Sequence, residues 1–83
     1  MIVARTDLIT KLEERLAGRS SAAALAAWAF DLFYELEQGE AEAAPEDGDA
    51  IAAVLDELLF ADDERFALEP EELRRLIARL QQP

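Results

Sequence analysis

The sequence predicts an all-α protein, a single-domain antiparallel four-helix bundle over residues 1–83. Three observations lead to this expectation. Apolar residues recur at the 3.6-residue helical period in four separate segments. No segment shows the strict alternation of apolar and polar residues that is typical of a half-buried strand. The first two helical segments are separated only by Gly18-Arg19-Ser20, and so short a connection favours an antiparallel pair.

The first helix is expected over about residues 6–17. Thr6 is its expected N-cap, because a threonine hydroxyl accepts a hydrogen bond from a free backbone N–H of the first turn. Gly18 is expected to end the helix, since glycine enters the left-handed conformation without a Cβ penalty. The apolar stripe of this helix consists of Leu8, Ile9, Leu12 and Leu16.

The second helix is expected over about residues 21–38, between a Ser20 cap and Gly39. Its apolar residues cover more than half of the circumference, and a helix of this kind must be covered on more than one side. We therefore expect it to be the central helix of the bundle. The residues of its apolar surface are Leu25, Trp28, Ala29, Leu32, Phe33 and Leu36, widened by Phe30 and Tyr34.

An acidic loop is expected over residues 39–49, followed by a third helix over about residues 50–61. Asp49 is the expected cap of this helix. Phe60 is expected to turn into the core at the end of the helix. The stripe that predicts the helix has i, i+3, i+4, i+7, i+8 spacing and consists of Ile51, Val54, Leu55, Leu58 and Leu59.

The fourth helix is expected over about residues 70–81, with Glu69 as its N-cap and Pro70 at the first helical position, where a missing N–H costs nothing. Its charges follow the helix dipole, because acids occupy the first turn and arginines lie towards the C-terminus. Its apolar stripe consists of Leu73, Leu76, Ile77 and Leu80.

The chain contains no histidine and no cysteine. Catalytic triads use histidine as the general base, so this class of enzyme is excluded. Glycoside hydrolysis by two carboxylates needs a sugar groove that a chain of this size has little core to support. We therefore expect no enzyme, no catalytic residue and no cofactor.

The acidic run Glu46-Asp47-Gly48-Asp49 offers oxygen ligands of the kind that hard cations bind. Its spacing does not match the EF-hand loop, which needs Asp-x-Asp-x-Asp-Gly and a later glutamate. We therefore interpret the run as part of an acidic loop, and no metal ligand is expected.

Sixteen acidic residues and a single base, Arg65, occupy residues 31–72, and the whole chain carries a net charge of −11. Phosphates are repelled by such a block, which argues against nucleic acid and anionic membranes and favours a cationic partner. The alternative explanation of the charge is solubility alone. A cytoplasmic protein is expected, because no apolar run reaches the ~20 residues that cross a bilayer and the N-terminus lacks the apolar core of a signal peptide.

Three carboxylates, Asp62-Asp63-Glu64, follow the third predicted helix at the negative end of its dipole. Anions are unfavourable there, and such local conflicts are typical of functional sites. Tyr34 and Phe66 are the expected aromatic anchors of the interface. The candidate partner-binding surface consists of Asp47, Asp49, Asp56, Glu57, Asp62, Asp63, Glu64, Phe66 and Tyr34.

Two segments carry a family resemblance: Asp56-Glu57-Leu58-Leu59-Phe60-Ala61-Asp62-Asp63-Glu64-Arg65-Phe66 and Leu73-Arg74-Arg75-Leu76-Ile77-Ala78-Arg79-Leu80. The chain resembles the immunity proteins that protect a bacterium from its own colicin D-type, transfer-RNA-cutting toxin. The resemblance implies an acidic, all-helical inhibitor that blocks the basic active-site cleft of a cognate toxin. In that family, acidic side chains take the place of the RNA phosphates.

The alternative is a small acidic adaptor or homo-oligomeric scaffold, whose helices pair through apolar residues such as Phe30, Tyr34 and Phe60. Binding through charges weakens as salt rises, whereas apolar association does not. A monomer is favoured here, with a basic toxin domain as its partner.

Overall fold

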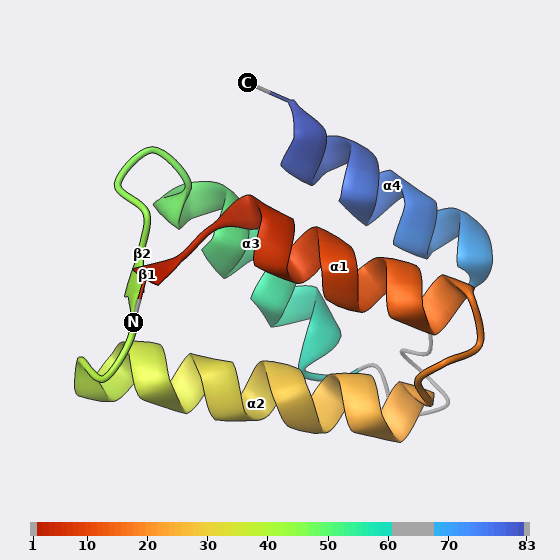
Figure 1. Ribbon diagram of the computed structural model, residues 1–83, viewed down its shortest axis with the longest axis horizontal. Helices are drawn as coiled ribbons and strands as arrows, with labels where there is room; N and C mark the ends of the chain where they lie inside the picture. The colour runs from red at the N-terminus through yellow and green to blue at the C-terminus, as the bar shows by residue number, and fades with distance from the viewer. Residues whose placement is uncertain (1, 61–67, 83) are drawn as a thin grey trace.

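Four helices and a two-stranded sheet make up the computed structural model, which describes residues 2–60 and 68–82 (Figure 1). The prediction of an all-α protein is confirmed in part, because the described chain is mostly helical but also contains a small sheet. In chain order the elements are β1 (Ile2–Val3), α1 (Arg5–Leu16), α2 (Ala22–Gln38), β2 (Glu42–Ala43), α3 (Gly48–Leu58) and α4 (Pro70–Gln81).

The N-caps of the first two helices differ from the prediction by one or two residues. The N-cap of α1 is Ala4 rather than Thr6, and the carboxylate of Asp7 accepts a hydrogen bond of 2.9 Å from the Ala4 N–H. The N-cap of α2 is Ser21 rather than Ser20, and its hydroxyl accepts a 3.1 Å bond from the N–H of Ala24. In both helices a side chain satisfies a backbone donor that the helix leaves free.

The N-cap of α3 is Asp47 rather than the expected Asp49, and its side chain makes no cap hydrogen bond. The helix ends at Leu58, with Leu59 as its C-cap, which is about three residues before the predicted end at residue 61. The start of α4 is confirmed, with Glu69 as N-cap and Pro70 in the first turn.

A short parallel ladder between β1 and β2 was not predicted. Ile2 pairs with Glu42 and Val3 with Ala43, and the N–H of Ala44 donates a 2.8 Å bond to the Val3 carbonyl. Strands of two residues carry no periodic signal in a sequence. The predicted loop over residues 39–49 is therefore ordered in part by the N-terminus of the chain.

The expectation that the second helix is central was wrong. Helices α1 and α3 each contact all three other helices, and α4 packs most extensively on α1. Figure 1 shows α2 along one edge of the molecule, with α1 beside it and α3 running obliquely behind α1. Among the described helices, only α1 and α3 pack extensively on α2.

The core contains residues from every helix and from both strand regions. Val3 and Ala41 bring the N-terminus and the segment before β2 into it. Phe60, expected to turn into the core, is instead 57% exposed. The buried helical residues of the core are Leu8, Leu12, Leu25, Ala29, Leu32, Ile51, Val54, Leu55, Leu58, Leu73, Leu76 and Leu80.

Candidate functional site

The predicted partner-binding residues differ in exposure, and some of them lie outside the described part of the chain. Asp49 and Asp56 are exposed at the start and on the outer side of α3, as the apolar stripe of that helix implies. Tyr34 on α2 is 52% exposed. Four of the predicted residues, Asp62, Asp63, Glu64 and Phe66, lie outside the described residues.

Asp47 does not belong to an exposed binding surface. It is buried, and its Oδ1 lies 2.5 Å from Nε of Arg5. The same guanidinium donates to the backbone carbonyls of Glu46, Leu80 and Gln82. The carboxylate of Asp47 therefore has a structural role, because its charge is compensated within the chain and turned away from water.

Glu57 is also paired, but in a different environment. Its Oε1 lies 3.6 Å from the guanidinium of Arg79 on α4, and both side chains are nearly half exposed. Exposed pairs of this kind contribute little to stability, because water and salt screen them. Glu57 thus remains accessible to a partner, although an arginine of the same chain competes for it.

The negative surface extends well beyond the predicted set. Residues 31–60 contain ten carboxylates and no lysine or arginine. Within the part of the chain that the structure describes, only Asp47 and Glu57 of these ten form ion pairs. The eight carboxylates without an ion pair are Asp31, Glu35, Glu37, Glu40, Glu42, Glu46, Asp49 and Asp56.

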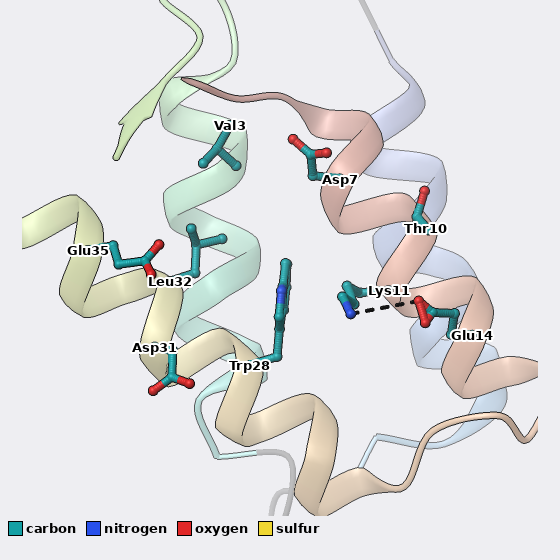
Figure 2. A pocket seen from close by; sticks show the side chains of 9 residues that line it. All are labelled: Val3, Asp7, Thr10, Lys11, Glu14, Trp28, Asp31, Leu32 and Glu35. Atoms are coloured by element: carbon teal, nitrogen blue, oxygen red, sulfur yellow. Dashed lines mark ion pairs between the residues drawn. The ribbon is translucent and has the colours of Figure 1, made fainter. Parts of the chain in front are cut away.

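A groove between α1 and α2, with a volume of about 530 Å³, was missed by the sequence reasoning (Figure 2). The Trp28 ring stands between the two helices, and the Lys11 ammonium lies 5.6 Å from its centroid. Carboxylates surround this pair on both helices: Asp7 and Glu14 on α1, Asp31 and Glu35 on α2. The four-residue spacing within α2 places Asp31 and Glu35 on the same face. The short connection predicts that α1 and α2 are neighbours, but not which faces of the two helices meet.

The groups that the candidate surfaces offer to a ligand are carboxylates and, in the groove, the Trp28 ring. Across residues 2–60 and 68–82, no three Asp or Glu residues are arranged to hold a metal ion. No helix within these ranges is long and apolar enough to cross a membrane. The carboxylates are suited to binding organic cations such as ammonium and guanidinium groups.

No protein-family model matches the chain, and neither a curated protein nor a solved structure is significantly similar to it.

Proposed function

We propose that this chain is a binding protein for a basic protein partner. In a sharper form of this proposal, the chain is an immunity protein. It blocks the basic active-site cleft of a cognate ribonuclease toxin, and its carboxylates mimic RNA phosphates. The observation that carries the proposal is the group of eight carboxylates of residues 31–60 that form no ion pair within the described chain.

Electrostatics explains why such a surface suits a basic partner. Uncompensated carboxylates repel one another, and a cationic protein that approaches them lowers that repulsion. Complementary charge also steers encounter, so association is fast at low salt. An enzyme cleft that binds RNA presents lysine and arginine side chains to phosphates, and the same side chains bind carboxylates.

The sharper form is supported by the family resemblance of residues 56–66 and 73–80. It includes an antiparallel four-helix arrangement, a monomeric state and action in the cytoplasm, where transfer RNA is found. Asp49, Asp56 and Glu57 are the described carboxylates that we assign to the partner-binding surface, with Tyr34 as an aromatic anchor. The assignment of Asp62, Asp63, Glu64 and Phe66 rests on the sequence, and Asp47 is left out because it binds Arg5.

The test begins with the neighbouring coding sequence, where the proposal expects a large protein with a basic C-terminal domain directly upstream, and continues with co-expression of that domain and this chain. That domain alone is expected to stop growth and to cleave transfer RNA, and both effects are expected to disappear when this chain is present. A domain that kills equally well in the presence of the chain contradicts the sharper form, as does the absence of any toxic neighbour.

The surface assignment is tested with Asp49→Asn/Asp56→Asn, two isosteric changes that remove charge on α3. The association rate constant for the basic domain is expected to fall about tenfold at low salt, because rim charges act mainly on encounter. The matched control is Glu13→Gln/Glu71→Gln, which removes two exposed carboxylates from α1 and α4. Equal effects of the two variants would count against a localised surface.

The adaptor or homo-oligomer remains a second candidate, because one observation favours it. Phe30 and Tyr34 are 49% and 52% exposed on α2, and their ring centroids are 5.3 Å apart. Ala23 and Ala27 continue this exposed apolar strip towards the start of the helix. A second copy of the chain would cover such a strip, and the oligomeric state separates the two candidates.

A further inference from the structure

We propose that the groove between α1 and α2 receives a lysine or arginine side chain of the basic partner, and that Lys11 occupies this place in the free protein. We rest this inference on the proposed function, since it names where a basic protein inserts a cationic side chain. The groove differs from the surface assigned above, whose described carboxylates are on α3 and whose aromatic anchor is Tyr34.

The first support is the aromatic wall of the groove. Trp28 is partly buried between α1 and α2, and the Lys11 ammonium lies 5.6 Å from the ring centroid. In Figure 2 the ring is seen edge-on, with Lys11 on the side of α1 and Leu32 on the side of α2. Indole is the best aromatic acceptor for an ammonium or guanidinium group. The ring thus already binds the class of group that we propose for the partner.

The second support is the charge of the groove. Four carboxylates, of Asp7, Glu14, Asp31 and Glu35, line it together with a single cation. Lys11 is 3.8 Å from Glu14, and the two form a partly exposed i, i+3 pair on the same helix. Asp31 and Glu35 form no ion pair with any other described residue. The groove therefore has an excess of negative charge that one further cation would reduce.

The third support is the shape. The groove is open to solvent and about 530 Å³ in volume, which suits a long side chain that enters from a docked surface. A lysine or arginine stem packs on apolar walls while its charged head contacts carboxylates. The partly buried Trp28 ring provides the main apolar wall here, because Val3 and Leu32, which also line the groove, are almost fully buried. Nucleic acid and anionic lipid are disfavoured, because their phosphates meet the four carboxylates.

Competition with Lys11 follows from this geometry. An incoming ammonium or guanidinium takes the ring face, while Lys11 moves on its flexible stem towards Glu14. The internal lysine then acts as a competitor that lowers the affinity for the partner. Removal of Lys11 is consequently expected to strengthen binding, which a role in fold stability alone does not predict.

The experiment measures binding of a fluorescein-labelled peptide of alternating lysine and arginine by anisotropy. Asp31→Asn/Glu35→Gln is expected to weaken binding about tenfold, as two ion pairs of moderate strength imply. The matched control, Glu13→Gln/Glu71→Gln, removes the same number of exposed carboxylates elsewhere and is expected to change affinity less than about threefold. Equal weakening by both variants overturns the proposal.

A second comparison keeps the test valid if the groove variant fails to fold. Lys11→Met is expected to bind the peptide about threefold more tightly than Arg75→Met, which removes an exposed cation from α4. Trp28 is the only tryptophan, so its emission reports the groove directly and is expected to change on peptide binding. Equal affinities of the two variants, or unchanged emission at saturation, overturn the proposal.

Two further comparisons distinguish a failure of the groove assignment from a failure of the proposed function. If Asp49→Asn/Asp56→Asn loses peptide binding and the groove variant does not, the basic partner stands and the groove assignment falls. If no variant and no wild-type protein binds the peptide, and the toxin domain is not neutralised either, both fall. Spermidine that displaces the peptide at equal concentration would make the groove a polyamine site and overturn its assignment to a protein side chain.

Discussion

The Nε atom of Arg5 lies 2.5 Å from Oδ1 of Asp47, and this pair joins parts of the chain that are 42 residues apart in sequence. The guanidinium also donates to the carbonyls of Leu80 and Gln82 at the end of α4, where the helix dipole is negative. One arginine therefore connects the first residues of the chain, the segment before α3 and the end of α4. The side chains are only 21% and 12% exposed, so water screens the pair less than a surface ion pair.

Asp47→Asn is expected to lower the free energy of unfolding by about 1–3 kcal/mol, because it leaves a partly buried guanidinium without its counter-charge. The loss does not come from helix capping, since the Asp47 side chain makes no cap bond in α3. Urea unfolding followed by circular dichroism measures the change. Glu57→Gln is the control, with an expected loss below about 0.5 kcal/mol, because its pair with Arg79 is exposed. Similar losses would show that the Arg5 pair has no special role.

Gly39→Ala and Gly48→Ala are expected to change stability in opposite directions. Gly39 ends α2 with a φ of +79°, and the N–H of Glu40 donates back to the Glu35 carbonyl over 2.9 Å. Alanine in this left-handed conformation is expected to cost about 1–2 kcal/mol. Gly48 begins α3 without a positive φ, so alanine is expected to stabilise by about 0.5 kcal/mol.

The two glycine variants are compared by thermal and urea unfolding. An added Cβ meets no atom within 4 Å at either position, so the difference between the variants isolates the backbone conformation. A loss of stability of the same size at both positions would contradict this explanation.

Val3→Ala is expected to lower the free energy of unfolding by about 1–3 kcal/mol, because Val3 is 1% exposed and belongs to the core. Ile2→Ala is the matched control on the same strand. Ile2 is 67% exposed, and its truncation is expected to change stability by less than about 0.5 kcal/mol. Equal losses of unfolding free energy for the two variants would contradict the packing of the Val3 side chain of β1 in the core.

Phe30→Ser/Tyr34→Ser tests the adaptor candidate. Sedimentation equilibrium over a concentration series is expected to give the monomer mass of 9.2 kDa for both the wild type and the variant, since like charges on neighbouring copies repel. The variant is expected to lose no more than about 1 kcal/mol of stability, because the two rings are half exposed and contact each other. A wild-type dimer that the variant abolishes would favour the adaptor instead.

Local chemistry explains the parts of the fold that could be predicted. The stripes of α1, α3 and α4 predicted buried residues such as Leu12, Leu55 and Leu76, because helical spacing alone places them on one face. Gly39 and Pro70 mark helix ends through their own backbone preferences, and the structure has them there. The exposure of Asp49 and Asp56 follows from the same spacing.

The features that could not be predicted depend on which distant segments of the chain meet in the fold. The apolar residues of α2 cover more than half of its circumference, and its sequence does not say which of them the described chain covers and which, like Phe30 and Tyr34, stay about half exposed. The assignment of Asp47 to a binding surface was wrong. Its partner Arg5 is 42 residues away in the sequence, and only the folded chain brings the two together. The groove at Trp28 was missed for the same reason, since its two walls are separate helices.

The sequence by itself therefore determined where the four helices are, which residues of three of them are buried, and that the middle of the chain is strongly negative. Only the tertiary structure decided which carboxylates are compensated, which face of α2 is covered and where a groove opens. The physical reason is range: helical periodicity and capping act within a few residues, whereas ion pairing and packing join residues tens of positions apart.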